Sequence, residues 1–301
     1  MFNKCLSLFS VSVIAGAALW ARSTTQAPDY RAIADWPQLP AGFQFGQVTG
    51  VATDRDDNVY VFHRGKKPLA VFDKAGKFLR GWGDYLVKTA HGLRIDAAGN
   101  IWTTDIGSHL VMKFDAEGKL LLTLGQKNKP GDTPDTFNKP ADVAVAPSGE
   151  FYVADGYGNS RVVKFSRDGK YLKEWGKKGK GEGEFNLPHA ICLDAKGRVY
   201  VGDRENDRIQ VFDADGKFLG QWRNSGAPFG LHLHAGQMFV ADGRAHAINV
   251  MNLDGKRLHT WGMKGTDAGQ FRLPHWVCRD SQGALYVAEV DGKRVQKFAA
   301  P

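Results

Sequence analysis

The feature that most constrains the fold is a pattern that recurs six times along the chain. Each unit contains an apolar strand, Asp-x-x-Gly, a strand with an acid near its end, a strand ending in Phe, a second Asp-x-x-Gly, and a strand ending in Trp-Gly. The clearest copy is LPHAICLDAKGRVYVGDRENDRIQVF at residues 187–212, followed by DADGKFLGQW. Repeats of about 40–50 residues with four short strands are typical of propeller blades. The sequence therefore predicts an all-β fold, a six-bladed β-propeller.

The repeats also set the expected blade boundaries. Blades are predicted at approximately 47–83, 88–125, 138–176, 186–222, 226–262 and 272–298. The sixth unit stops at Phe298 without a fourth strand, and residues 30–45 precede the first unit without a repeat partner. We expect this N-terminal segment to close the ring by pairing with blade six, which would remove two exposed sheet edges. A disordered N-terminal tail is the alternative.

The first 27 residues differ in composition from the rest of the chain. Lys4 precedes an apolar run at residues 5–20, small residues follow, and no acid occurs before Asp29. This layout is typical of a signal peptide, and cleavage near Ala21 or Ala27 would leave a mature domain of residues 28–301. The prediction is an exported protein, periplasmic or secreted, with no membrane association after cleavage. A retained anchor is the alternative, although the run is shorter than the roughly 20 residues of a spanning helix.

Charge and cysteine content exclude some partners and bonds. The formal net charge is +8, but its strongest basic cluster, Lys177, Lys178 and Lys180, lies in a glycine-rich loop without interleaved aromatic residues. We interpret this cluster as a solvated loop, so no nucleic-acid partner is expected. Cys192 and Cys278 occupy equivalent strands two repeats apart, which is too distant for a disulfide. We expect two free, buried thiols and a monomeric protein.

One column of the repeat alignment predicts a metal site. The position two residues before the recurring apolar residue of each first strand holds, in chain order, Thr49, His91, Ala141, His189, Phe229 and His275. Alternate blades of a six-fold ring lie about 120° apart, and the innermost strands line the axis. The three histidines should therefore converge, and three protein histidines plus an open position form a ligand set of catalytic zinc. Descent by repeat duplication is the alternative, but it does not explain the different residues in the intervening blades.

Other polar residues follow the second strands, at the predicted mouth of the same channel. They are His63-Arg64, Asp155-Gly156-Tyr157 and Asp203-Arg204-Glu205. An arginine near a metal suits a substrate carboxylate, because its planar fork can bind two oxygens. A tyrosine beside a metal and an arginine could have a lowered pKa and act as a general base. The alternative is that these arginines and the tyrosine only bond neighbouring blades.

These motifs resemble a known family. The repeats are similar to the NHL type, and the chain resembles peptidyl-α-hydroxyglycine α-amidating lyase (peptidylamidoglycolate lyase) over nearly all of residues 48–298. The motifs that carry the resemblance are VTGVATDRDDNVYVFHRG (48–65), HGLRIDAAGNIWTTD (91–105), KPADVAVAPSGEFYVADGYGNSRVVKF (139–165), the 187–212 segment quoted above, and LPHWVCRDSQGALYV (273–287).

The resemblance implies an activity and roles for residues. It implies a zinc ion held by His91, His189 and His275, with a catalytic tyrosine and two active-site arginines at Tyr157, Arg64 and Arg204. The implied reaction cleaves a peptidyl- or N-acyl-α-hydroxyglycine to an amide and glyoxylate. The partner would then be a small-molecule or peptide substrate with a terminal carboxylate, which an arginine would hold.

The chain departs from the family pattern at several positions. The family's calcium site uses a carboxylate just after the third zinc histidine, where this chain has Trp276. The carbonyls of Val51 and Leu93 remain, but Ca²⁺ takes 6–8 oxygen ligands, so we do not expect calcium there. The cysteines of two family disulfides and a family methionine are replaced by Asn138, Gly158, Tyr200, Val211 and Leu273.

Two other functions compete with the lyase. One is a non-catalytic NHL propeller that binds a peptide, glycan or protein partner over its channel face, with zinc structural or absent. The other is a propeller hydrolase or lactonase, which we would expect to use calcium and acidic ligands. The channel column holds histidines rather than carboxylates, which disfavours the second.

Overall fold

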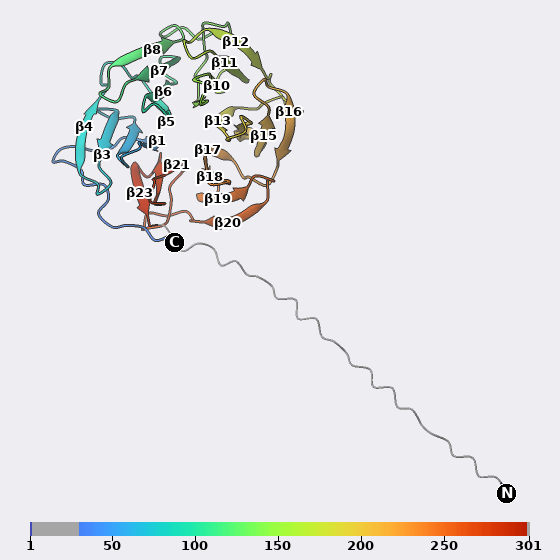
Figure 1. Ribbon diagram of the computed structural model, residues 1–301. Coiled ribbons are helices and arrows are strands. Elements are labelled where there is room, and N and C mark those ends of the chain that lie inside the picture. Colours follow the sequence, from blue (N-terminus) through green and yellow to red (C-terminus); the bar gives the residue numbers. More distant parts are fainter. Residues whose placement is uncertain (2–29, 300–301) are drawn as a thin grey trace.

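The computed structural model describes residue 1 and residues 30–299. The predicted leader therefore lies outside the described residues, apart from Met1. Six antiparallel sheets surround a central axis (Figure 1), which confirms the predicted six-bladed β-propeller. The described residues contain one short 3-10 helix, η1 (Arg204–Asn206), and none of their helices is long and apolar enough to cross a membrane.

The strands follow chain order within each blade. Blade 1 holds β1 (Val48–Thr53), β2 (Val59–His63), β3 (Leu69–Phe72) and β4 (Phe78–Trp82). Blade 2 holds β5 (Ala90–Ile95), β6 (Ile101–Asp105), β7 (Leu110–Phe114) and β8 (Leu120–Leu124). Blade 3 holds β9 (Asp142–Val145), β10 (Phe151–Asp155), β11 (Arg161–Phe165) and β12 (Tyr171–Trp175).

The second half of the ring repeats this plan. Blade 4 holds β13 (Pro188–Leu193), β14 (Val199–Asp203), β15 (Arg208–Phe212) and β16 (Phe218–Trp222). Blade 5 holds β17 (Pro228–His234), β18 (Gln237–Asp242), β19 (Ala247–Asn252) and β20 (Arg257–Trp261). Blade 6 holds β21 (Pro274–Arg279), β22 (Leu285–Glu289) and β23 (Arg294–Phe298).

The apolar core is distributed between the blades. The second strands are buried along their whole length, except at Gln237 of β18, whereas the fourth strands of the blades consist mostly of exposed and partly exposed residues. Each of the six apolar clusters contains residues from two neighbouring blades, such as Tyr152 of blade 3 with Val201 of blade 4. A single blade would leave both apolar faces in water, and stacking neighbours around the axis buries them.

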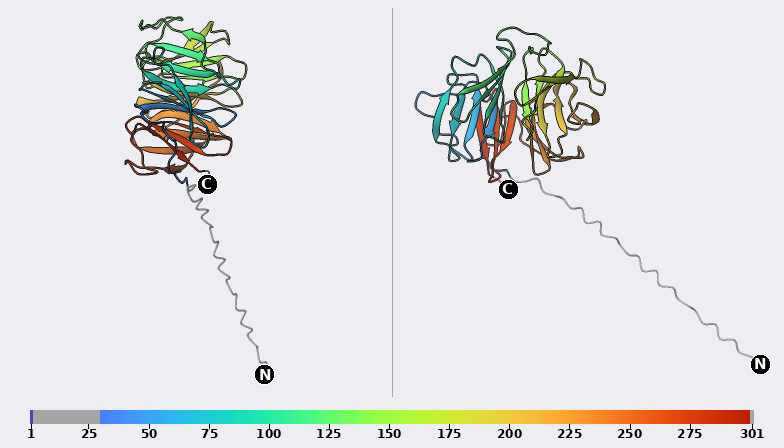
Figure 2. Two further views of the ribbon diagram at one scale, coloured as in Figure 1. Left: turned by 90° about the vertical axis from the view of Figure 1, so that its left-hand side faces the viewer. Right: turned by 45° about the horizontal axis from the view of Figure 1, so that its top comes forward.

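The N-terminal segment closes the ring, as predicted. The Ile33 N–H donates to Lys297 O at 2.8 Å, and the Ala299 N–H donates to Arg31 O at 2.9 Å. The start of the described segment thus lies beside the end of β23, near the C-terminus in both views of Figure 2. The pairing is one antiparallel bridge at Ala32 rather than a full fourth strand. Beyond it, Trp36 is buried between blades 1 and 6.

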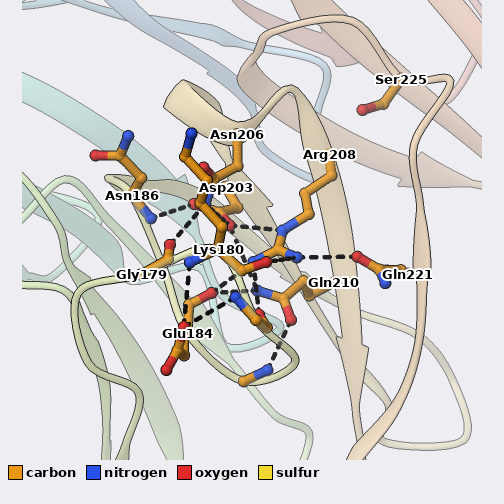
Figure 3. Close-up of polar contacts among 12 residues, drawn as sticks. Gly179, Lys180, Glu184, Asn186, Asp203, Asn206, Arg208, Gln210, Gln221 and Ser225 are labelled. Atoms are coloured by element: carbon orange, nitrogen blue, oxygen red, sulfur yellow. Dashed lines mark hydrogen bonds and ion pairs between the residues drawn. The ribbon is translucent and has the colours of Figure 1, made fainter.

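The acid that ends most second strands holds the loop entering its blade. In blade 4, Asp203 Oδ2 accepts from Arg208 Nε at 2.8 Å, and Asp203 Oδ1 accepts from the Asn186 N–H at 2.6 Å (Figure 3). Arg208 also donates to the carbonyls of Lys180, Gly181 and Glu184. Equivalent pairs are the buried Asp155–Arg161 and Glu289–Arg294, in which only the acid is buried.

These pairs explain what positions the channel strands. Asn186 lies three residues before His189, so Asp203 fixes the segment that leads into β13. Glu289 likewise accepts from the Arg272 N–H at 2.6 Å, three residues before His275. In blade 2, Asp105 accepts from the N–H groups of Lys88 and Thr89, just before His91. The acids are therefore structural supports of the histidine-bearing strands.

Cys192 and Cys278 are free and buried, as predicted. Burial raises the pKa of the Cys192 thiol to about 12 and raises that of Cys278 as well. Neither thiol is therefore a reactive thiolate at neutral pH, and the ring is held without a disulfide among its described residues.

Candidate metal centre and active site

The structure brings the three column histidines together in the channel. His91, His189 and His275 lie on β5, β13 and β21, the first strands of alternate blades, and all three are buried. Their potential ligand atoms all lie within 4.8 Å of one another. The ring centroids are 4.7, 4.8 and 5.0 Å apart. The convergence expected from six-fold symmetry is therefore present.

Backbone carbonyls from the intervening blades orient the rings. The Nδ1 atoms of His91, His189 and His275 lie 2.7, 2.6 and 2.7 Å from the carbonyl oxygens of Ala141, Phe229 and Thr49. A carbonyl can only accept, so each Nδ1 carries the proton and each Nε2 has a lone pair and no proton. Ala141, Phe229 and Thr49, the other three described residues of the column, thus orient the histidine rings through their main-chain carbonyl groups.

The electrostatics keep this cluster neutral. Burial lowers the pKa of His275 to about 3, helped by the positive charges of Arg64 and Arg204. Burial also lowers the pKa of His91 and His189 well below the ordinary value, and in each case neighbouring histidines and Arg204 contribute. Three neutral imidazoles can therefore present lone pairs to one point at physiological pH.

These donors fit a transition-metal ion. Imidazole nitrogen suits zinc, copper, iron and nickel, so the ligand set alone does not select one metal. Coordination at about 2.1 Å in a tetrahedron separates ligand atoms by about 3.4 Å. Small inward movements of the rings, whose nitrogens lie within 4.8 Å of one another, would complete such a site.

Tyr157 covers the open side of the histidine cluster. Its hydroxyl lies 3.0 Å from His91 Nε2 and 2.9 Å from His189 Nε2. Tyr157 follows Gly156 in the loop after β10, where a Cβ on the glycine would lie 1.9 Å from Pro188 O. Any side chain at position 156 would push this loop away from β13, so the Asp-Gly-Tyr order places the phenol over the imidazoles.

The pKa of Tyr157 differs from the sequence expectation. Burial raises it above the ordinary value, although the positive charges of Arg204 and Arg64 oppose the shift. The reason is that the free-energy cost of transferring a phenolate out of water exceeds the stabilisation by the two arginines. The protein groups alone therefore favour the neutral phenol.

Two arginines lie at the mouth of the channel beside Tyr157. Arg204 donates to the Tyr157 hydroxyl at 3.2 Å, and its guanidinium lies 4.6 Å from the centre of the Phe229 ring. Arg64 donates to Ala90 O at 3.1 Å and to Gln47 Oε1 at 2.8 Å. Both arginines are half-buried and held in place, an arrangement that suits recognition of a carboxylate.

Several polar residues that follow the second strands do not join the site. His63 is buried against Phe43 and Phe45, and its Nδ1 accepts from the Gly46 N–H at 3.1 Å. Burial lowers the His63 pKa to about 4. Asp155 and Asp203 are engaged by the structural arginines described above. Glu205 instead pairs with Arg204 and Arg244, which makes it a support of Arg204.

Sequence reasoning missed a second polar cluster in the channel. Arg94 of blade 2 forms a bidentate ion pair with Asp142 of blade 3, at 3.1 Å from Nε and 2.6 Å from NH2. The same guanidinium donates to Leu231 O at 3.0 Å and Ile191 O at 3.1 Å. It also lies 4.6 Å from the centre of the Trp276 ring. One side chain thus links five of the six blades.

This cluster bears on the predicted absence of calcium. Trp276, which stands in place of the expected carboxylate, faces the Arg94 guanidinium. The Arg94 guanidinium is itself a cation and would repel a calcium ion in this position. The carbonyl oxygens of Leu231 and Ile191, which point to this position, already accept hydrogen bonds from Arg94. That calcium does not bind here stays a prediction.

Comparisons with known proteins show which proteins this chain resembles. Residues 137–165 and 185–212 match the NHL repeat. The chain is 36% identical over 204 residues to peptidyl-glycine alpha-amidating monooxygenase B of Xenopus laevis, a match that covers 57% of this chain and 23% of the relative. It is 35% identical over 190 residues to probable peptidyl-alpha-hydroxyglycine alpha-amidating lyase pgal-1 of Caenorhabditis elegans, which covers 54% of each protein. The matched segment is thus under a quarter of the first relative and about half of the second.

Solved structures share the fold. A streptogramin B lyase superposes with a TM-score of 0.65 at 14% identity, over 91% of this chain and 97% of that one. This similarity shows the propeller architecture alone. Together, the NHL repeats and the relatives show an NHL-repeat β-propeller that resembles amidating lyases, and they support a lyase-type function.

Proposed function

We propose that the protein is a zinc-dependent carbon–nitrogen lyase that cleaves a peptidyl- or N-acyl-α-hydroxyglycine to an amide and glyoxylate. The observation that carries the proposal is the placement of Tyr157 over the histidine cluster, with its hydroxyl within 3.0 Å of two imidazole nitrogens. Arg64 and Arg204 flank this point. The similarity to amidating lyases supports the same reaction class.

The substrate carries a hydroxyl, an amide nitrogen and a carboxylate on one carbon. Cleavage removes the hydroxyl proton, forms the carbon–oxygen double bond of glyoxylate, breaks the carbon–nitrogen bond and returns a proton to nitrogen. A zinc ion held by His91, His189 and His275 would supply a Lewis acid that polarises the substrate oxygens. The catalytic roles within the chain then fall to Tyr157 and the two arginines.

Tyr157 takes the hydroxyl proton and returns one to the departing nitrogen. The phenol must first be able to ionise, and burial opposes this. The positive charges of Arg204 and Arg64 favour the phenolate, and a divalent cation on the neighbouring imidazoles would add to them. The same two arginines hold the substrate carboxylate, so the carbon between carboxylate and amide lies beside the Tyr157 oxygen.

We also propose that the enzyme acts outside the cytoplasm as a monomer. The signal-peptide layout of residues 1–27 supports export. Export is tested by determining the N-terminal residue of the protein recovered from the extracytoplasmic fraction. A mature chain that begins near residue 22 or 28 supports it, and full-length protein in the cytoplasm contradicts it.

Metal removal is the most direct test of the proposed function. The purified protein is expected to hold about one zinc ion per chain, as a site with three protein ligands does, and to release glyoxylate from α-hydroxyhippurate. Treatment with a chelator should remove the metal and the activity together, and added zinc should restore both. Elemental analysis and a glyoxylate assay on the same samples measure this. Full activity in metal-free protein would exclude the mechanism.

Replacing Tyr157 by phenylalanine separates proton transfer from metal binding. Y157F should lower kcat by roughly 10²–10⁴-fold, the usual contribution of a positioned acid or base, while zinc content stays the same. Steady-state kinetics and metal analysis check the two expectations. Tyr171, an exposed residue on β12, provides the matched control, and Y171F should behave as wild type. A Y157F enzyme with near-normal kcat would remove Tyr157 from the chemistry.

A further inference from the structure

Arg204 is held in one orientation at the mouth of the channel, and its side chain is only 14% exposed. Its Nε donates to Glu205 Oε1 at 2.8 Å, and its guanidinium carbon lies over the Phe229 ring, 4.6 Å from the ring centre. NH1 donates to the Tyr157 hydroxyl at 3.2 Å, and NH2 makes no hydrogen bond to the described residues. The end of the guanidinium fork is therefore turned towards Tyr157 and can still donate to a substrate oxygen.

The pairing with Glu205 weakens Arg204 as a receptor for an anion. An arginine that already pairs with a carboxylate attracts a second carboxylate less strongly, because its charge is partly compensated. Arg64 differs in this respect, since it donates to Ala90 O and Gln47 Oε1, which carry no charge. Recognition of a substrate carboxylate by Arg204 therefore requires that the charge of Glu205 be balanced by another group.

Arg244 of blade 5 provides this balance. Arg244 NH2 forms an ion pair with Glu205 Oε2, the carboxylate oxygen that Arg204 does not use. Arg244 NH1 also binds Asp207 Oδ1 at 2.8 Å, but the Asp207 side chain is 58% exposed and so more strongly screened by water. Although partial burial opposes it, the two arginines hold the pKa of Glu205 below its ordinary value. Glu205 is thus an ionised group shared by two guanidinium groups.

The repeat explains why Arg244 reaches the channel mouth. Tyr157, Glu205 and Arg244 each stand two residues after the acid that ends the second strand, in blades 3, 4 and 5. Equivalent positions of neighbouring blades lie at the same end of the channel. Gly243 precedes Arg244, and a Cβ there would lie 2.8 Å from the Phe229 ring. The glycine therefore lets this loop pack on the ring that also supports the guanidinium of blade 4.

We propose that Arg244 is a positioning residue that acts through Glu205 and makes Arg204 a receptor for the substrate carboxylate. This proposal rests on the proposed function and deepens it. Glu205 fixes the Nε side of Arg204, and Arg244 balances the charge of Glu205. The free end of the Arg204 fork then meets an incoming anion without an unbalanced carboxylate beside it. Arg244 contributes to specificity in this way without touching the substrate.

The first test measures how well the zinc-loaded enzyme distinguishes a carboxylate from a carboxamide. α-Hydroxyhippurate and N-benzoyl-α-hydroxyglycinamide both release benzamide on cleavage of the carbon–nitrogen bond, so one assay serves for both. R244M should lower the ratio of their kcat/KM values, carboxylate to carboxamide, by at least about fivefold, because like charges at a binding site repel. The change should lie mostly in the KM of α-hydroxyhippurate and should shrink at high salt. A ratio unchanged from wild type would overturn the proposal.

Two further variants separate the charge of Arg244 from a merely structural role. R244K keeps the positive charge and should keep most of the wild-type ratio. The double variant R244M with E205Q should recover the ratio that R244M loses, because glutamine still offers an oxygen to Arg204 Nε but carries no charge. A lost structural contact would not be recovered in this way. A double variant as impaired as R244M would therefore contradict the proposal.

Lys177 provides the matched control. It is a cation in the loop after β12 that pairs with Glu184 at 3.3 Å, and its side chain is 77% exposed. K177M removes one positive charge from the protein, as R244M does, but leaves Glu205 balanced. Its ratio should equal that of wild type. If K177M lowered the ratio as much as R244M, the effect would belong to the overall charge of the protein and the proposal would fail.

A binding measurement keeps the proposal testable if no substrate is cleaved. Hippurate lacks the scissile hydroxyl, so calorimetry on the zinc-loaded protein reports binding alone. Wild type should bind hippurate at least about fivefold more tightly than R244M, and the double variant should bind it as wild type does. This binding pattern without any glyoxylate release would reject the lyase function but keep the role of Arg244. Equal affinity of wild type and R244M, or no binding to wild type, would reject that role.

Discussion

Replacing His189 by alanine is expected to abolish zinc binding and glyoxylate release together. The three imidazoles are buried and already oriented by carbonyl groups of neighbouring blades. Two histidines cannot complete a site that needs three protein ligands. The loss of activity should exceed the 10–100-fold typical when only an outer partner of a metal ligand is removed. Metal analysis and glyoxylate release on one preparation measure both effects.

The chain offers a matched control for this variant. His232 is a histidine on β17, the first strand of blade 5, and burial lowers its pKa to about 3. It does not belong to the metal-binding group of described residues. H232A should therefore retain zinc and activity, whereas H189A should lose both. Zinc retained in H189A, or lost to the same extent in H232A, would contradict the assigned ligands.

The loss in H189A must also be distinguished from a failure to fold. His189 makes a hydrogen bond to Phe229 O, and its removal should cost on the order of 1 kcal/mol in the metal-free protein. The β-rich circular dichroism spectrum should thus be the same for H189A and the metal-free wild type. The thermal stabilisation that zinc gives the wild type should be missing from H189A, because a ligand that binds only the native state stabilises it.

The fold was predictable because a repeat multiplies weak signals. A single unit of apolar strands and Asp-x-x-Gly turns is compatible with many β folds, but six copies at similar spacing indicate a propeller. The same repetition made the histidine column visible, since His91, His189 and His275 occupy equivalent positions in alternate units. Their convergence follows from symmetry, which needs no knowledge of side-chain contacts.

The roles of the acids were harder to predict. Asp155 and Asp203 end buried strands near the channel mouth, and proximity alone made them candidates for the site. Each instead pairs with an arginine on the next strand, Arg161 and Arg208. An arginine recurs five or six positions after the acid, also in Glu289 and Arg294, and this sequence signal could have identified the acids as structural.

Other features depend on contacts that the sequence does not display. Arg94 and Asp142 are 48 positions apart and belong to different blades. Each is the only Asp, Glu, Lys or Arg in its strand, which indicates a special environment but not a partner. The shift of the Tyr157 pKa also depends on the balance between burial and two arginines, and this balance requires three-dimensional positions.

Replacing Arg94 by methionine is expected to destabilise the protein more than any other single substitution considered above. Asp142 is fully buried, the Arg94 side chain is 17% exposed, and they form a bidentate pair. R94M would leave a buried carboxylate without its partner, which costs about 3–5 kcal/mol in comparable cases. For a chain of this size the melting temperature should fall by roughly 10 °C. Calorimetry on the zinc-free protein measures the effect without a contribution from the metal.

The pair should also affect the metal centre through the backbone. Asp142 follows Ala141, whose carbonyl orients His91, and Trp276 follows His275 and faces Arg94. Loss of the Arg94–Asp142 pair should loosen these strands and so lower the affinity for zinc, and with it the activity at limiting zinc. Neither Arg94 nor Asp142 is a proposed zinc ligand. Excess zinc should restore part of the activity of R94M. It should not restore that of H189A, because H189A has lost a ligand rather than its support.

Two further variants decide whether the buried pair is the cause. Arg198 and Asp194 form an ion pair through a single contact at 2.6 Å, with the arginine side chain 33% exposed. R198M should change stability by no more than about 1 kcal/mol, as surface pairs do. The double variant R94M with D142L removes both charges and should be more stable than R94M alone, because no buried carboxylate remains unpaired. The stability losses of R94M and D142L could instead simply sum in the double variant, or R94M could be as stable as R198M. Either result would show that the Arg94 guanidinium is not the central link between blades.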